Sequence, residues 1–322
     1  MINILDEVRG CKTIGISGHI RPDGDCVGAC MGMALYLEKA MPDAHVDVYL
    51  EHFSEALEHN IIGAEQIQHE IPSNLAPYDA FICLDCEKER LGDALDPYMK
   101  AAKRINIDHH MTNPGTGDVN WVVPTASSAC ELVFLTMEEE WIDREVAQNL
   151  YIGMVTDTGV FMYSNTGRQT MEIAGKLISY GFDFSAIVRE VFYEKTYIQQ
   201  QILGRALLES IRFLDGRCIV SRIDRGTMRF YQVTSSDMNG IASELVHTEG
   251  VCCSIFMYET ETRTYKVSLR STGEVNVAEL AKLYGGGGHA RAAGFTCSAS
   301  CHDIINSLSP RIEEQLKAGV KC

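Results

Sequence analysis

The chain has 322 residues, of which 46% are hydrophobic and 22% charged, and its formal net charge is −16. A chain of this length suits two domains that each bury a core, and its composition excludes an intrinsically disordered protein. The negative charge excludes a general lysine- and arginine-rich surface for nucleic acid, so an anionic ligand must be bound by local positive charge or by backbone N–H groups.

The first half alternates between strand-like and helix-like segments. Short apolar runs bounded by turn residues predict strands, and apolar residues at helical spacing predict helices. Strands are expected at 12–18, 46–50, 78–84 and 104–107. Helices are expected at 26–40, 128–139, 144–155 and 169–180. This alternation predicts a parallel sheet covered by helices.

The pattern changes in the second half, where a helical stretch over about 184–212 is expected to join two domains. Strands are then expected at 218–223, 251–258 and 264–269, and helices at 276–283 and 303–317. The expected fold class is α/β. It combines an N-terminal parallel-sheet domain over 1–185, a helical linker over 186–213 and a smaller α/β domain over 214–322.

Four polar clusters follow predicted elements of the first half. In open α/β sheets, ligands bind beyond the carboxyl ends of the strands, so clusters that are far apart in sequence can meet there. Each cluster also has a purely structural interpretation, as a surface turn, a helix N-cap or a glycine-capped helix end. The clusters are His19-Ile20-Arg21-Pro22-Asp23-Gly24-Asp25, the single Asp85, Asp108-His109-His110-Met111-Thr112-Asn113 and Thr156-Asp157-Thr158-Gly159.

Together the clusters supply four carboxylates and two imidazoles, and His110 adds a third. So many acidic groups cannot share one site without cations. Mixed carboxylate and imidazole ligands suit Mn²⁺, with Mg²⁺, Fe²⁺ or Co²⁺ as substitutes, whereas a zinc site would more often include cysteine. Six ligands exceed the need of one ion, so two ions about 3.5–4 Å apart are expected. The expected ligands are His19, Asp23, Asp25, Asp85, His109 and Asp157.

The chain has 12 cysteines. Cys83 and Cys86 form an isolated Cys-x-x-Cys, and the sequence offers no second pair at zinc-site spacing. We therefore expect most cysteines to be small buried hydrophobic residues in a reducing compartment. The first residues show no basic region followed by an apolar stretch, and no run is long enough to span a bilayer. A cytoplasmic protein is expected.

The four clusters resemble, in order, the motifs of the DHH phosphoesterase superfamily, which is named after the Asp108-His109-His110 triplet. The second half resembles the DHHA1 domain in Gly285-Gly286-Gly287-Gly288-His289 and in the following Ala292-Ala293-Gly294-Phe295. Asn276-Val277-Ala278-Glu279-Leu280-Ala281 also fits that domain. Length and motif detail are most similar to the bifunctional oligoribonuclease and phosphoadenosine phosphate phosphatase group, the NrnA-type nano-RNases.

The resemblance implies how the site residues divide their roles. His19, Asp23 and Asp85 would hold one ion, and Asp85 would bridge to a second ion held with Asp25, His109 and Asp157. His110 would act beside the substrate phosphate, with Asp108 orienting a histidine. The active site would lie in the cleft between the domains. The residues expected to bind a terminal phosphate are Arg270, Gly287, Gly288 and His289.

Glycine runs are commonly flexible loops. Here the run is expected to form an anion-binding nest of backbone N–H groups, with a helix of small residues directly after His289. A nest at a fixed distance from the metals would restrict the enzyme to short substrates with a free terminal phosphate.

The expected function is metal-dependent hydrolysis of short oligoribonucleotides to mononucleotides, and of 3′-phosphoadenosine 5′-phosphate to AMP. Long duplex nucleic acid and membranes are not expected partners, and a homodimer stays open. Two alternatives use the same metals: a phosphodiesterase for linear di-adenylate and an exopolyphosphatase. A third is a non-catalytic nucleotide-binding scaffold on a degenerate DHH fold, which should have lost metal ligands, although none is missing here.

Overall fold

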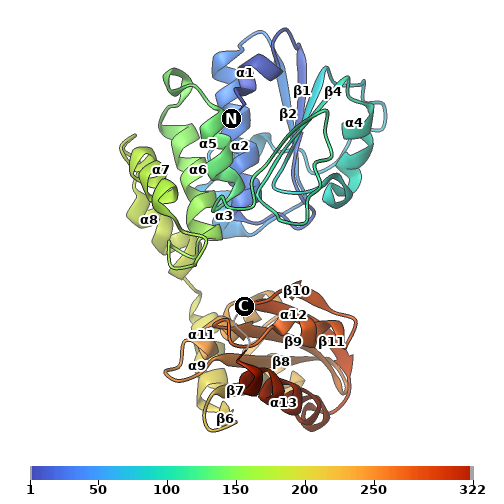
Figure 1. The fold of residues 1–322 in the computed structure, drawn as a ribbon, viewed down its shortest axis with the longest axis vertical. Helices are drawn as coiled ribbons and strands as arrows, with labels where there is room; N and C mark the ends of the chain where they lie inside the picture. The colour runs from blue at the N-terminus through green and yellow to red at the C-terminus, as the bar shows by residue number, and fades with distance from the viewer. Residues whose placement is uncertain (1, 320–322) are drawn as a thin grey trace. The chain divides into compact units, whose positions relative to one another are not determined.

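The structure is a computed structural model that describes residues 2–319. The chain divides after Glu194 into two compact units, which are described separately (Figure 1). Among the described residues, no helix combines the length and the apolar character needed to cross a membrane.

The first unit is built on a five-stranded sheet in the order β2-β1-β3-β4-β5, in which every neighbouring pair is parallel. The order reverses between β1 and β3, which makes the carboxyl ends of these two strands the expected ligand position in a doubly wound sheet. The strands are β1 (Thr13–Ser17), β2 (His45–Tyr49), β3 (Ala80–Leu84), β4 (Lys103–Asp108) and β5 (Val119–Val122).

Helices cover both faces of this sheet. Figure 1 shows α2, α5 and α6 on one side and α4 on the other. Short 3₁₀ turns lie at Ala64–Gln66, Lys88–Arg90, Gly92–Ala94 and Glu139–Trp141. The helices are α1 (Ile4–Glu7), α2 (Gly24–Ala40), α3 (Glu55–Asn60), α4 (Leu95–Lys100), α5 (Ala129–Thr136), α6 (Arg144–Asp157), α7 (Arg168–Ile178) and α8 (Phe184–Val188), followed by the π-helical turn η5 (Arg189–Tyr193).

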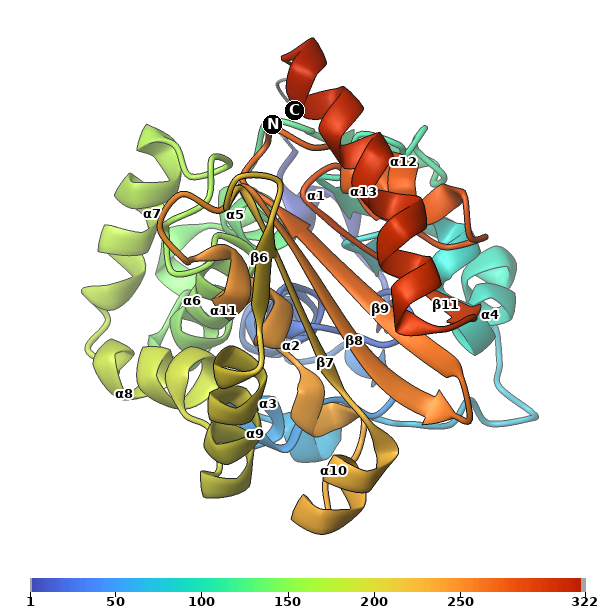
Figure 2. The ribbon, with the colours of Figure 1, turned by 90° about the horizontal axis from the view of Figure 1, so that it is seen from below.

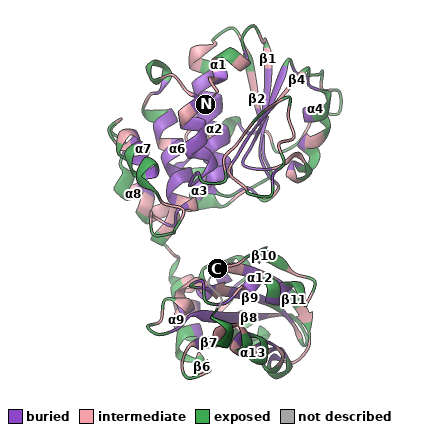
Figure 3. Ribbon diagram, viewed as in Figure 1, coloured by how far each residue is buried: buried purple, intermediate pink, exposed green. Residues whose placement is uncertain are grey.

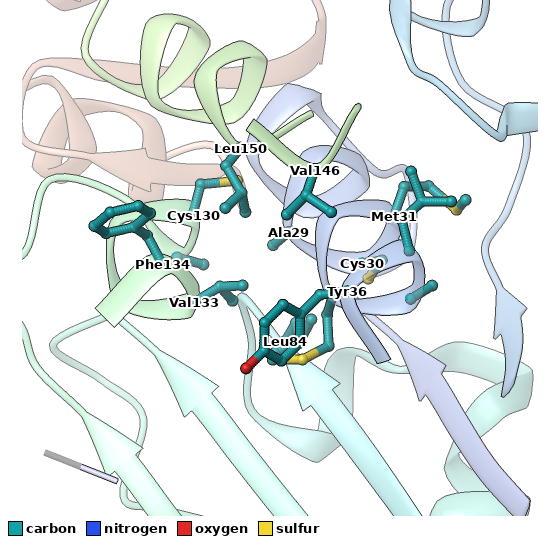
Figure 4. Close-up of a cluster of buried hydrophobic side chains, with 14 of the residues drawn as sticks. Ala29, Cys30, Met31, Tyr36, Leu84, Cys130, Val133, Phe134, Val146 and Leu150 are labelled. Carbon is teal, nitrogen blue, oxygen red and sulfur yellow. The ribbon is translucent and has the colours of Figure 1, made fainter. Parts of the chain in front are cut away.

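The central helix α2 is buried along most of its length (Figure 3). It packs closely on α6: a Cβ added to Gly28 would lie 2.5 Å from the carbonyl oxygen of Asn149. Apolar side chains of α2, α5 and α6 close the core around this contact, among them Ala29, Val133 and Leu150 (Figure 4). The close approach brings the first turn of α2 and the last turn of α6 to the same edge of the sheet.

The predicted α/β alternation of the first half is confirmed, although the short helices α1, α3 and α4 were not predicted. Two further differences concern α2 and β5. Helix α2 begins at Gly24 rather than at 26, because the Asp23 carboxylate accepts the N–H groups of Asp25 and Cys26 and caps the helix there. Strand β5 was not predicted, since four partly exposed residues give no clear alternation of apolar and polar side chains.

The second unit contains a mixed six-stranded sheet in the order β10-β11-β9-β8-β7-β6, in which β7 and β8 are parallel and the other pairs antiparallel. Figure 2 shows α13 lying across one face of this sheet. The strands are β6 (Ile211–Phe213), β7 (Cys218–Ile223), β8 (Cys253–Glu261), β9 (Thr264–Ser271), β10 (Gly287–His289) and β11 (Ala292–Ser298). The helices are α9 (Tyr197–Leu208), α10 (Arg225–Tyr231), α11 (Ile241–Val246), α12 (Val277–Lys282) and α13 (Cys301–Ala318), with a 3₁₀ turn at Ser236–Met238.

The prediction of a helix after His289 is wrong, because the chain there continues into β11, which pairs with β10 in a hairpin. Ala293 and Phe295 alternate with less buried residues and belong to the apolar core, so the segment has the period of a strand. The glycines serve the hairpin. A Cβ on Gly286 would lie 2.2 Å from the Gly294 carbonyl oxygen, and Gly288 has a φ of +139°.

The segment between the two predicted domains is not one continuous helix. Residues 194–196 separate η5 from α9, and β6 then pairs with β7. Helix α9 packs within the second unit through Ile202 and Ala206, which are fully buried in its apolar core.

Candidate metal centre

His19 and Asp85 follow β1 and β3, at the point where the strand order reverses. His19 Nδ1 lies 2.9 Å from the carbonyl oxygen of Ile20, which accepts its N–H, so Nε2 carries the lone pair in the neutral ring. That nitrogen lies 3.4 Å from Asp85 Oδ2 and 3.7 Å from Asp23 Oδ1. A histidine that donates one ring N–H to a carbonyl group and presents the other nitrogen to carboxylates has the arrangement of a metal ligand.

Asp85 lies at the centre of the site. It is 2% exposed, and its backbone has a φ of 59°, a left-handed conformation that aspartate tolerates better than most residues. Its Oδ1 atom has no hydrogen-bond partner among the described residues, and it lies 3.4 Å from His109 Nε2 and 3.6 Å from His110 Nδ1. A buried carboxylate oxygen without a donor is costly unless a cation or a proton compensates it.

Asp25 and Asp157 approach the same imidazole from α2 and α6. His109 Nε2 lies 3.8 Å from Asp25 Oδ2 and 3.8 Å from Asp157 Oδ2. The Asp25 carboxylate also accepts the first N–H groups of α5, from Ala129 at 2.6 Å and from Cys130 at 2.9 Å. Each oxygen accepts one N–H and retains a lone pair, so Asp25 can cap α5 and bind a cation at once.

Both oxygens of the Asp108 carboxylate accept hydrogen bonds from neighbouring protein groups. Its Oδ1 accepts hydrogen bonds from the backbone N–H groups of His109 and His110 and from His110 Nδ1, at 2.7, 3.1 and 2.8 Å. Its Oδ2 accepts a bond of 2.6 Å from Asn113. With both oxygens occupied, this carboxylate is arranged to orient His110.

The site is electrostatically unbalanced without cations. Burial, together with the charges of Asp85 and Asp157, raises the pKa of Asp25 well above its usual range. Burial also raises the pKa of Asp157, to about 6, although His109 opposes the shift. Burial lowers the pKa of His109, but its contacts with Asp85 and Asp25 outweigh that effect and raise the pKa to about 10. The cluster therefore holds protons in place of other positive charge.

These observations fit divalent cations. Three overlapping groups of donor atoms, each with all atoms within 4.8 Å of one another, could hold an ion. Asp85 belongs to two groups and His109 to two, so the groups form one continuous centre. The groups are His19, Cys26 and Asp85; Asp25, His109 and Asp157; and Asp85, Asp108, His109 and His110. The specific ion and the number of ions belong to the proposal below.

In the second unit, the four residues that were predicted to bind a terminal phosphate lie on β9 and β10. Arg270 of β9 and His289 of β10 are both paired with Ala292 of β11, so all three side chains point to the same face. Gly287 and Gly288 are exposed residues of β10. Arg270 Nε donates to Ser243 Oγ at 3.3 Å.

Three residues that support the site were not predicted. Asn106 Nδ2 donates to the carbonyl oxygens of Cys83 and Cys86, which flank Asp85, and its Oδ1 accepts from Asn113. Asn165 Nδ2 donates to the Asp157 carbonyl oxygen at 3.2 Å. Cys26 adds a thiol to the His19 group. Of these three residues, only Asn106 could have been recognised in the sequence, because it is a polar residue between the apolar Ile105 and Ile107.

The model of the DHH family N-terminal domain matches residues 13–154, and the model of the DHHA1 domain matches residues 215–318. The chain therefore combines a DHH family N-terminal domain with a DHHA1 domain. Family and relatives together make it a hydrolase of phosphoester bonds.

Two curated relatives share the name bifunctional oligoribonuclease and PAP phosphatase NrnA. The protein from Bacillus subtilis is 26% identical over 287 residues, covering 88% of both chains, and that from Thermus thermophilus is 29% identical over 301 residues, covering 91% of this chain and 86% of the relative. The crystal structure of an exopolyphosphatase-related protein from Bacteroides fragilis matches with a TM-score of 0.88 at 25% identity. That match covers 98% of this chain and 96% of the other.

Proposed function

We propose that this chain hydrolyses short oligoribonucleotides to mononucleotides and 3′-phosphoadenosine 5′-phosphate to AMP, with two divalent cations as cofactors and Mn²⁺ as the preferred ion. The observation that carries the proposal is the buried Asp85 carboxylate, whose unpartnered oxygen faces two imidazoles while its other oxygen faces His19. The NrnA relatives supply the substrate class.

The ligands divide into two sets that share Asp85. The first set is His19, Asp23 and Asp85, and the second is Asp25, Asp85, His109 and Asp157. Cations held there would lower the pKa of a bound water and offset charge on the phosphate oxygens. The α2–α6 contact and the cap of α5 fix Asp25 and Asp157 before any substrate arrives, so little reorganisation is needed during the reaction.

His110 has the position of a residue that acts on the substrate. Its Nδ1 atom lies 2.8 Å from Asp108 Oδ1, and burial of that carboxylate keeps the ring in one orientation. The hydrogen bond to Asp108 raises the pKa of His110, against the effect of burial. A protonated His110 can stabilise a phosphate oxygen or give its proton to the leaving ribose oxygen.

Arg270, His289 and the N–H groups of Gly287 and Gly288 would bind the terminal phosphate of the substrate. The shared face of Arg270 and His289 supports this role. The site would accept only substrates with a free terminal phosphate near the scissile bond, which suits a chain whose net charge of −16 offers no long basic groove.

The test is hydrolysis by the purified full chain with Mn²⁺. The substrates are a 5′-phosphorylated RNA dinucleotide, a long RNA, 3′-phosphoadenosine 5′-phosphate, inorganic pyrophosphate and a short polyphosphate. An Asp108→Ala/His109→Ala double variant is the control. Rapid, metal-dependent cleavage of the dinucleotide with slow cleavage of the long RNA is expected. Turnover of polyphosphate alone would instead favour an exopolyphosphatase, the activity to which the Bacteroides fragilis protein is described as related.

A further inference from the structure

Cys26 lies beside the proposed metal centre, directly after Asp25 on the first turn of α2. Its side chain is fully buried. The thiol packs against the turn that precedes His19, since a Cβ added to Gly18 would lie 2.2 Å from Cys26 Sγ. The backbone of this cysteine is fixed as well, because its N–H donates to Asp23 Oδ1 at 3.2 Å.

The thiol shares its surroundings with two other donor groups. One donor atom each from His19, Cys26 and Asp85 lie within 4.8 Å of one another, and all three residues are buried. A single ion can serve such a group after small side-chain adjustments, because its bonds to nitrogen, oxygen and sulfur are about 2.0–2.3 Å long. His19 Nε2 lies 3.4 Å from Asp85 Oδ2, and both side chains are buried.

We propose that Cys26 supplies a thiolate ligand to the His19 and Asp85 side of the metal centre, which raises the affinity of that position for a thiophilic ion such as Zn²⁺ relative to Mn²⁺. The inference rests on the proposed metal centre and adds a ligand to it. Carboxylate and imidazole ligands alone favour Mn²⁺, whereas a thiolate shifts the preference toward Zn²⁺. With Asp23 Oδ1 3.7 Å from His19 Nε2, one nitrogen, two oxygen and one sulfur ligand would complete a four-coordinate zinc site.

Binding requires the thiol to lose its proton but involves no change of oxidation state. The S–H bond breaks, the proton goes to solvent, and the sulfur–metal bond forms without an oxidant. Cys30 lies one turn further along α2, and a Cβ added to Gly18 would lie 3.5 Å from its Sγ. Cys30 is also fully buried but belongs to none of the metal-ligand groups, which makes it the matched control.

The experiment loads the full-length protein with one equivalent of Zn²⁺ and records X-ray absorption at the zinc edge. The wild type and Cys30→Ser should show a sulfur neighbour at about 2.3 Å beside nitrogen and oxygen at about 2.0–2.2 Å. Cys26→Ser should retain the nitrogen and oxygen neighbours and lose sulfur. The ratio of its Zn²⁺ affinity to its Mn²⁺ affinity should fall by at least about tenfold. Even the loss of a side chain that only hydrogen-bonds to a metal ligand lowers metal affinity by that much.

Further variants separate the outcomes. Cys26→Ala replaces Cys26→Ser if the serine variant unfolds, as judged by circular dichroism. Asp85→Asn should also lose the sulfur neighbour of zinc. A sulfur neighbour that remains in Asp85→Asn would belong to other cysteines and would overturn the proposal. Zinc bound by nitrogen and oxygen alone in the wild type would overturn the thiolate ligand while leaving the metal centre intact. Failure to bind either Zn²⁺ or Mn²⁺ would remove the metal centre itself.

Discussion

At the scale of single residues, Asp108 tests how the site is positioned. It is fully buried and accepts four hydrogen bonds, from two backbone N–H groups, His110 and Asn113. Asp108→Asn keeps the size of the side chain but replaces one acceptor oxygen with an amide group that faces donors. We expect hydrolysis to fall by about 10–100-fold, as for other outer partners of metal-site residues. Initial rates at saturating metal measure this effect.

The matched control is Asp118→Asn. Asp118 also carries a carboxylate near the sheet, but it pairs with Arg104 at 2.7 Å, and its side chain is 44% exposed. Loss of this pair should change the free energy of unfolding by no more than about 1 kcal/mol and leave the rate unchanged. Equal rates for Asp108→Asn and the wild type would show that Asp108 does not position the site.

The sequence was sufficient to predict which carboxylate and imidazole side chains gather at one edge of the first sheet, because they stand in short polar clusters that follow apolar segments. The buried partners could not be predicted in the same way. Asn106 and Asn165 act through side-chain hydrogen bonds to carbonyl groups, and such bonds depend on tertiary contacts. Cys26 resembles any small core residue until the packing of α2 places it beside His19.

At the scale of elements, the contact between α2 and α6 determines whether Asp25 and Asp157 meet. Gly28→Ala should force the helices apart, since the new Cβ would lie 2.5 Å from a backbone oxygen that cannot move freely. We expect a loss of about 1–3 kcal/mol in the free energy of unfolding, typical of an overpacked core. Denaturant unfolding of the metal-free protein measures the change.

Gly175→Ala is the control for this substitution. Gly175 lies inside α7, and a Cβ there would meet nothing within 4 Å. The higher helix propensity of alanine should therefore stabilise the protein by up to about 1 kcal/mol. If both alanine variants were equally stable, close packing at Gly28 would not be what holds the two helices together.

Elements with a clear hydrophobic pattern could be predicted from the sequence. Elements whose conformation depends on pairing with other segments of the chain could not. Strand β3 at the middle of the first sheet is a continuous, fully buried apolar run, as expected when helices cover both faces. Strand β11, which follows the glycine run, was mistaken for a helix because its alanine and glycine residues give little hydrophobic periodicity. Its strand character comes from pairing with β9 over seven residues, from Ala292 opposite Arg270 to Ser298 opposite Thr264.

At the scale of the whole molecule, metal should stabilise the first unit. The excess of 44 acidic over 28 basic residues, with several carboxylates gathered at one edge, makes the metal-free protein self-repelling. With Mn²⁺ at about 100 times its dissociation constant, each bound ion should add about 2.7 kcal/mol to the free energy of unfolding. For a unit of this size, each ion should therefore raise the melting temperature by roughly 5–10 °C.

Calorimetry with Mn²⁺ and with a chelator measures this shift. Asp85→Asn provides the comparison, because it removes the carboxylate shared by both ligand sets and should abolish most of the increase. An equal increase in that variant would place the stabilising ions elsewhere on the acidic surface.

The central claim is that the aspartate and histidine cluster of the first unit binds two catalytic cations. The most direct measurement counts Mn²⁺ per chain by equilibrium dialysis and follows dinucleotide hydrolysis in the same samples. We predict two ions per wild-type chain, hydrolysis that rises as they bind, and loss of both in Asp85→Asn. Hydrolysis that continues in wild-type protein after its metal has been removed would contradict the claim.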